Sequence, residues 1–135
     1  PFDQASREGN EFIMVGHISV PGITGDYTPA SLSGQMVYET LRRLLGYNGV
    51  IVTDALDQDE IIYNYGTRYA SIMAIQAGCD MLLSPYDFQS AYYGVLNAVY
   101  DGTISEERID ESVRRILKAK QELILWETLS EQFKN

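Results

Sequence analysis

The sequence predicts an α/β protein with a parallel sheet, because short apolar runs alternate along the chain with longer helical patterns. Three runs, residues 12–18, 49–54 and 79–84, are dominated by aliphatic residues and do not alternate polar with apolar positions. Strands of this composition are typical of parallel sheets that are covered on both faces. They begin near positions 13, 50 and 80, a spacing that fits successive β/α units with right-handed crossovers.

The segments between these strands carry helical signals. Apolar residues recur at helical spacing over residues 36–45, and Ser33 is the expected N-cap of that helix. A shorter helix is expected over residues 67–77, ended by Gly78, and a third over residues 91–99. The predicted order is therefore β, α, β, α, β, α, followed by one more helix.

That last helix has the clearest signals. Ser105 is its expected N-cap, and Glu106 and Glu107 suit the positive end of the helix dipole. One face of the helix is apolar and consists of Ile109, Val113, Ile116, Leu117, Leu123 and Ile124. We expect one domain over residues 1–124 and a helical tail over residues 125–135.

Three strands make an incomplete sheet. A closed parallel barrel of β/α units needs about eight strands, and three fully apolar strands leave two edges unpaired. The sequence therefore predicts either a fragment of a barrel or a half-barrel that pairs with something else. Two copies that cover each other's edges would give a homodimer.

The composition argues against several classes of partner. The formal net charge of −9 makes nucleic acid and anionic membrane surfaces poor partners, and no run approaches the ~20 apolar residues of a membrane helix. The single cysteine, Cys79, allows no intrachain disulfide and no CxxC zinc site, and its apolar neighbours predict a small buried residue. The chain starts at Pro1 rather than at Met, so we expect the native N-terminus to be missing and infer no compartment.

In parallel α/β folds the active site gathers at the C-terminal ends of the strands. This rule selects Gly16-His17, Thr53-Asp54 and Ser84-Pro85. Asp54 is the most informative, because an acid directly after an aliphatic strand is badly placed for packing. From the residues alone, a helix cap or ion-pair partner and a catalytic acid explain Asp54 equally well.

The other polar candidates have simpler explanations. His17 is the only histidine, and it could act on substrate or could hold a loop or a carboxylate through a ring N–H. It has no ligand partners at suitable spacing, so neither a metal nor a cofactor is expected. Asp57, Asp59 and Glu60 fit a solvated loop and a helix start, whereas Asp80 begins the third strand, at the end where structural roles prevail.

Five motifs in order make the sequence similar to a known family. They occupy residues 13–21 (IMVGHISVP), 29–33 (PASLS), 45–57 (LGYNGVIVTDALD), 77–83 (AGCDMLL) and 104–117 (ISEERIDESVRRIL). Together they resemble glycoside hydrolase family 3, and within it the β-N-acetylglucosaminidase (β-hexosaminidase) group. The resemblance covers residues 1–124, and its specificity comes from several motifs at the right spacing.

The resemblance implies a fold and an activity. The fold is a (β/α)₈ TIM barrel, of which this chain would hold the last three parallel β/α units. The activity is that of a retaining exo-glycosidase acting on terminal β-linked N-acetylglucosamine or a related sugar. Asp54 would be the nucleophile that forms a covalent glycosyl-enzyme, and His17 would at most contact the carbohydrate substrate.

The resemblance also implies that part of the active site lies elsewhere. The Lys-His-Phe-Pro-Gly-type motif of the family and the loop histidine that serves as acid/base in this group do not occur in the sequence, and His17 does not occupy that motif. We therefore expect the isolated chain to be inactive. β-Glucosidases and β-xylosidases share the family, so the sugar stays open. A non-catalytic half-barrel that self-associates is the alternative from another class.

Overall fold

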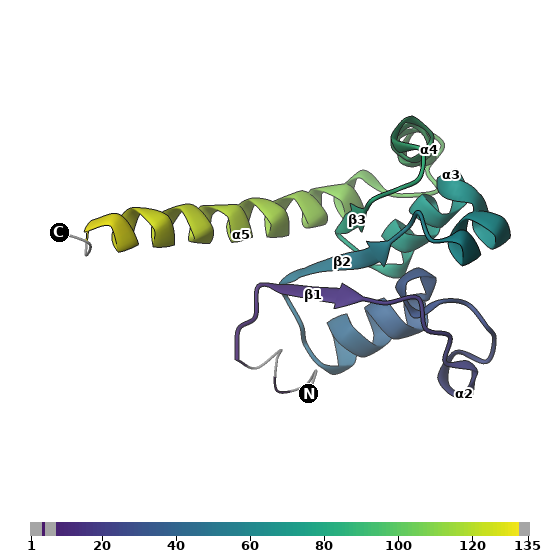
Figure 1. Ribbon diagram of the computed structural model, residues 1–135, viewed down its shortest axis with the longest axis horizontal. Helices are drawn as coiled ribbons and strands as arrows, with labels where there is room; N and C mark the ends of the chain where they lie inside the picture. The colour runs from purple at the N-terminus through teal and green to yellow at the C-terminus, as the bar shows by residue number, and fades with distance from the viewer. Residues whose placement is uncertain (1–3, 5–7, 133–135) are drawn as a thin grey trace.

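The structure, a computed structural model, describes residue 4 and residues 8–132 of the chain. Within them, strands β1 (Phe12–Val15), β2 (Val50–Ala55) and β3 (Met81–Leu83) form a parallel sheet in the order β1-β2-β3 (Figure 1). The predicted α/β class and the parallel pairing are confirmed. Strand β2 is central, so β1 and β3 are the edges of the sheet.

Helices connect and follow the strands in the predicted alternation. They are α2 (Pro21–Thr24), the 3₁₀ turn η1 (Ala30–Leu32), η2 (Gln35–Leu44), α3 (Asp59–Ala77), α4 (Phe88–Tyr100) and α5 (Glu106–Gln132). Figure 1 shows that α5 extends well beyond the body formed by the sheet and the other helices.

The first predicted helix forms, but its predicted cap is wrong. Gly34 occupies the N-cap position of η2, and no side chain caps that end. Ser33 is instead buried and contributes its backbone carbonyl, which accepts hydrogen bonds from the amides of Met36 and Val37. The preceding 3₁₀ turn places Ser33 too deep for its side chain to act as a cap.

Helix η2 is wound as a π-helix, which the apolar spacing did not predict. The amide of Leu45 donates to the carbonyl of Thr40, the i→i+5 bond that defines this winding. The wider turn keeps Val37 and Leu41 buried and rotates Leu44 into solvent, where it is 77% exposed. The apolar stripe assumed for an α-helix is therefore narrower than expected.

Helix α3 is longer than predicted, because it begins at Asp59 rather than Thr67. Gly66, with φ 69° and ψ 155°, interrupts it, so two helical segments follow one another across a kink. A residue with a side chain would be strained in that conformation. Asp59 and Glu60 lie in the first turn and Gly78 ends the helix in the left-handed conformation, as predicted.

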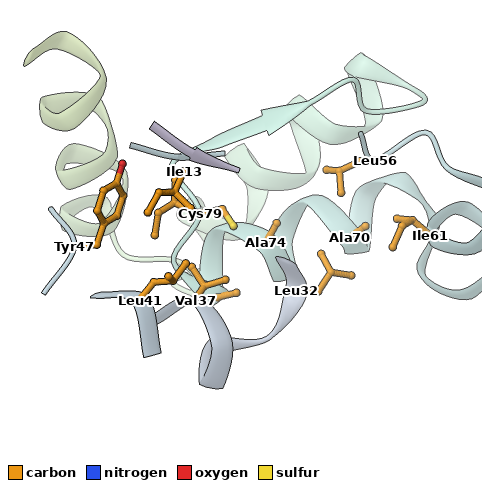
Figure 2. Close-up of a cluster of buried hydrophobic side chains, with 12 residues drawn as sticks. Ile13, Leu32, Val37, Leu41, Tyr47, Leu56, Ile61, Ala70, Ala74 and Cys79 are labelled. Carbon is orange, nitrogen blue, oxygen red and sulfur yellow. The ribbon is translucent and has the colours of Figure 1, made fainter. Parts of the chain in front are cut away.

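The core lies between one face of the sheet and the helices η2 and α3 (Figure 2). It contains Ile13, Leu32, Val37, Leu41, Tyr47, Ile51, Leu56, Ile61, Ala70, Ala74, Ala77 and Cys79. Burial raises the pKa of the Cys79 thiol to about 12, which keeps it protonated and unreactive at neutral pH. The predicted role of Cys79 as a small buried residue is confirmed.

The opposite face of the sheet is open, which contradicts the prediction of strands covered on both faces. Val52 of β2 pairs in register with Met14 of β1 and Met81 of β3, so these side chains share one face. Met14 is 54% exposed and Met81 is 38% exposed. Among the described residues, the crossovers η2 and α3 both pack on the other face of the sheet, where the core lies.

Helix α5 begins as predicted, with the hydroxyl of Ser105 accepting a hydrogen bond from the amide of Arg108 at 3.2 Å. Its predicted apolar face is largely exposed: Leu117 is 59% and Ile124 is 62% exposed. The helix continues without interruption to Gln132, through the boundary predicted after residue 124. Residues 133–135 of the predicted tail lie outside the described residues.

No helix in the described part of the chain is long and apolar enough to span a bilayer.

Candidate functional site

The C-terminal edge of the sheet brings the three predicted strand ends together. Parallel pairing places His17 after β1, Asp54 near the end of β2 and Ser84 after β3. Ser84 has φ 42°, a left-handed conformation that is uncommon for a residue with a side chain. Such backbone geometry is often found at functional sites. Asp54 occupies the middle of this edge because β2 is the central strand.

Asp54 points to the open face of the sheet. It lies two residues after Val52 on β2, and alternate residues of a strand share a face. Its side chain is half-buried, and its Oδ1 accepts one hydrogen bond, at 2.7 Å, from the amide of Ala55. That bond is local, so it holds the carboxylate at the strand end without covering it.

The two structural explanations of Asp54 do not hold in the described part of the chain. The N-cap of the following helix α3 is Gln58, so Asp54 does not cap that helix. The ion pairs among the described residues do not include Asp54 either. A carboxylate that is held in place but not neutralised by an ion pair is suited to react with a ligand.

His17 is bound through both ring nitrogens. Its Nε2 lies 2.9 Å from the carbonyl oxygen of Ala55, and because a carbonyl only accepts, Nε2 carries the proton and donates. Its Nδ1 lies 2.6 Å from the hydroxyl oxygen of Ser31, and in the tautomer with the proton on Nε2 that hydroxyl donates to Nδ1. His17 therefore joins the ends of β1 and β2 next to Asp54, as expected of a residue that holds a loop. Its substrate-binding role stays a prediction.

Asp80 lies at the opposite end of the sheet, and its predicted structural role is confirmed. Its side chain is completely buried. It accepts hydrogen bonds from the amide of Ile51 at 2.9 Å and from the hydroxyl of Ser112 at 2.7 Å. Three arginines, Arg42, Arg108 and Arg115, also converge on its two oxygens. Sequence spacing does not reveal this set, because Arg42 is far from the other two arginines in the chain.

The described residues hold no group of three or more His, Cys, Asp or Glu side chains that could bind a metal ion. Asp54 is the acid that the central strand presents at the C-terminal edge of the sheet. A parallel β/α segment with polar side chains at the C-terminal ends of its strands is typical of α/β enzyme domains.

The sequence matches the Glycosyl hydrolase family 3 N terminal domain over residues 1–119. The chain belongs to this family, as its motifs predicted. A curated relative, the β-N-acetylglucosaminidase/β-glucosidase of Cellulomonas fimi, is 31% identical over 128 residues, which cover 88% of this chain and 23% of that protein. The β-glucosidase C of Emericella nidulans is 32% identical over 133 residues, covering 89% of this chain and 21% of that protein.

A solved structure agrees with the sequence relatives. The family 3 β-N-acetylglucosaminidase from Paenibacillus sp. str. FPU-7 superposes with a TM-score of 0.85 and 40% identity, over 90% of this chain and 24% of that one. The chain thus spans about a quarter or less of the length of these three proteins. Their names include both β-N-acetylglucosaminidases and β-glucosidases, so membership of the family does not select one sugar.

Proposed function

We propose that this chain is part of a retaining exo-glycosidase that hydrolyses terminal β-linked N-acetylglucosamine or a related sugar, with Asp54 as the nucleophile. One observation carries the proposal. Asp54 lies at the C-terminal end of the central strand, on the face that the helices of the chain leave open, and no ion pair among the described residues neutralises it.

The proposed reaction has two steps. A carboxylate oxygen of Asp54 attacks the anomeric carbon, while the bond to the leaving-group oxygen breaks and an acid protonates that oxygen. The glycosyl ester on Asp54 is then hydrolysed by water, which gives its proton to the same group acting as a base. The first step needs the carboxylate of Asp54 ionised and held in place, and in the second step the same carboxylate is the leaving group. The bond from the amide of Ala55 to Oδ1 holds this carboxylate at the strand end. In this proposal the acid/base comes from outside the chain.

The same proposal explains the open sheet. We assign residues 1–124 to the last three units of a (β/α)₈ barrel and residues 125–135 to a helical tail. In such a barrel the inward-facing side chains of the strands pack in layers. Met14, Val52 and Met81 form a row across the open face that would contribute to such a layer. Strands β1 and β3 would pair with the neighbouring strands of the barrel.

Two alternatives remain as proposals. The first is a β-glucosidase or β-xylosidase of the same family, which the glucosidase names among the relatives favour. The second is a half-barrel that self-associates through the unpaired edges β1 and β3. Sedimentation at low protein concentration separates the second alternative, because a stable folded monomer contradicts edge pairing.

The first experiment measures activity with and without the missing segments. The 135-residue chain is assayed against aryl β-N-acetylglucosaminide, β-glucoside and β-xyloside. It is compared with a chimera in which the chain replaces the matching segment of the Paenibacillus enzyme. We expect turnover by the chimera and none by the isolated chain. Turnover by the chain alone at the rate of a complete barrel contradicts the proposal that its active site is incomplete.

The second experiment tests Asp54 in that chimera. Asp54→Asn removes the nucleophile and is expected to lower kcat by roughly a thousandfold or more, with KM little changed. Asp57→Asn, an acid three positions further along the chain, is the matched control and should keep most of the activity. A 2-fluoro glycoside should label the peptide that contains Asp54, as detected by mass spectrometry. Equal losses in both variants, or a label elsewhere, would remove Asp54 from the mechanism.

His17 can be tested in the same chimera. If His17 contacts the sugar, His17→Asn raises KM, whereas Ser31→Ala, which removes only the bond to Nδ1, leaves KM nearly unchanged. If His17 only holds the strand ends, both variants lower kcat and stability together. The split between KM and kcat therefore decides between the two roles.

A further inference from the structure

The end of the sheet opposite Asp54 carries an unusual concentration of positive charge. Arg42 of η2 and Arg108 and Arg115 of α5 converge on the buried carboxylate of Asp80. The Nη1 atom of Arg115 lies 3.0 Å from Oδ1 of Asp80, and that of Arg108 lies 3.6 Å from it. Arg42 bonds the other oxygen, Oδ2, through Nη2. We refer to Arg42, Arg108 and Arg115 as the arginine cluster.

The arginine cluster exceeds the charge of its acidic partners. Three guanidinium groups face Asp80 and one further acid, Glu111, whose carboxylate lies 3.5 Å from Nη2 of Arg115 and is 53% exposed. Three positive and two negative charges leave one positive charge over, in a chain whose formal net charge is −9. Buried charges are costly unless they are paired, so the site favours an additional anion.

Burial makes this excess charge significant. The side chain of Arg42 is only 8% exposed, and burial, together with the positive charges of Arg115 and Arg108, lowers its pKa, although Asp80 counteracts this. Each guanidinium has five N–H donors, and part of them are bound to backbone carbonyls. The acceptors are the carbonyls of Tyr47 and Gly49 for Arg42, and those of Ile75 and Cys79 for Arg108.

A cavity of about 360 Å³ adjoins the arginine cluster. All three arginines line it, together with Tyr38, Asn48, Gln76, Gly78 and the acid Glu111. Within the described part of the chain, none of the guanidinium nitrogens is both buried and without a hydrogen-bond partner. The walls come from η2, α3 and α5 and from the turns that contain Asn48 and Gly78.

We propose that this cavity binds a phosphate group, either as inorganic phosphate or as the phosphomonoester of a small molecule. A phosphate oxyanion accepts charge-assisted hydrogen bonds from forked guanidinium donors. At roughly 30 Å³ per water molecule, the cavity exceeds the volume of a phosphate ion and leaves room for a small substituent. The bound phosphate would neutralise the excess charge and displace Glu111 from Arg115.

The site is separate from the proposed reaction at Asp54. Asp80 bonds the amide of Ile51 at the beginning of β2, whereas Asp54 is three residues further on, about 10 Å along the strand. The proposal does not depend on the glycosidase activity, because binding can be measured without turnover. Failure of either proposal leaves the other intact.

The test is a calorimetric titration of the 135-residue chain with sodium phosphate at pH 7.5, against sodium chloride of equal ionic strength. We expect a dissociation constant on the order of 1 mM for phosphate. Glu111→Gln removes the competing carboxylate and should tighten binding by about three- to tenfold, whereas Arg115→Gln should weaken it by about tenfold. If Arg115→Gln folds poorly, the tighter binding expected for Glu111→Gln still tests the proposal.

Arg114→Gln is the matched control. Arg114 lies on the same helix, is 71% exposed, pairs with Asp110 and does not line the cavity, so its removal should change the affinity by less than about twofold. Glucose 6-phosphate is titrated in parallel: tighter binding than inorganic phosphate identifies a phosphomonoester site, and weaker binding identifies a site for the free ion. No binding of phosphate beyond the sodium chloride control, or equal effects of Arg114→Gln and Arg115→Gln, would overturn the proposal.

Discussion

Asp54 and Asp80 are both acids on the same small sheet, but their surroundings are opposite. Asp80 has no exposed side-chain area and is bonded by three arginines, a serine and a backbone amide. Asp54 is half-buried and holds one hydrogen bond, to the next residue. The comparison shows how a parallel sheet uses one residue type in two ways. At the N-terminal end of the sheet, the carboxylate of Asp80 links β2 to the helices η2 and α5. At the C-terminal end, the carboxylate of Asp54 has no ion-pair partner among the described residues and can contact a ligand.

The largest expected effect on stability comes from neutralising the buried carboxylate of Asp80. Asp80→Asn keeps the size of the side chain but leaves three guanidinium groups facing a neutral amide. Removing one partner of a buried ion pair typically costs about 3–5 kcal/mol. We expect the midpoint of urea unfolding to fall accordingly. Asp110→Asn, in an exposed pair with Arg114, is the control and should cost less than about 0.5 kcal/mol. A small effect of Asp80→Asn would mean that the arginines are satisfied without it.

A second change tests how closely the same end of the sheet is packed. A Cβ at Gly49 would lie 2.6 Å from the ring of Tyr47 and 2.7 Å from the carbonyl oxygen of Glu11. Tyr47 is 2% exposed and cannot move away easily, so Gly49→Ala should destabilise the chain by about 1–3 kcal/mol. At Gly34, where a Cβ meets nothing within 4 Å, alanine should not be destabilising. Equal unfolding midpoints for the two alanine variants would refute the packing argument.

Alkaline pH should lower the stability of the folded chain through two buried groups, Cys79 and Tyr47, which precede β3 and β2. Burial raises the pKa of Cys79 from 9.0 and that of Tyr47 from 10.0, each to about 12. Above about pH 9 the unfolded chain therefore binds fewer protons than the folded chain, and stability falls as pH rises towards 12. Urea midpoints at increasing pH should show this fall, and it should be shallower in the Cys79→Ala/Tyr47→Phe variant. The exposed Tyr63→Phe should leave the slope unchanged.

The smallest expected effect on stability comes from a substitution of Asp54, at the C-terminal end of the sheet. Asp54→Asn removes no ion pair and retains an acceptor oxygen for the amide of Ala55, so the unfolding free energy should change by less than about 0.5 kcal/mol. The same substitution at Asp80 is its counterpart. The comparison is confirmed if the two variants differ by several kcal/mol, and it fails if Asp54→Asn is as destabilising as Asp80→Asn.

Much of the fold followed from local sequence patterns. Aliphatic runs located all three strands, and Gly78 and Ser105 marked helix ends correctly. The π-winding of η2 did not follow, because the apolar spacing of residues 36–45 fits an α-helix equally well. The open second face of the sheet could not be predicted either. The composition of a strand indicates that it is apolar but not which element packs against it.

The candidate site was predictable only in part. The position of Asp54 after an aliphatic run identified it, because strand ends place acids at the edge of the sheet. The bonds from His17 to Ser31 and Ala55 depend on how loops fold back across 14 and 38 residues, which spacing does not encode. The arginine cluster was missed for the same reason, since η2 and α5 meet only in the folded chain.

The open face of the sheet has a consequence for how this chain behaves in a cell. Phe12, Met14, Met81 and Leu83 are each more than a third exposed on the two edge strands. Apolar side chains beside unpaired strand edges are the surface on which chains aggregate. In a cell, the isolated chain should therefore aggregate more readily as its concentration rises.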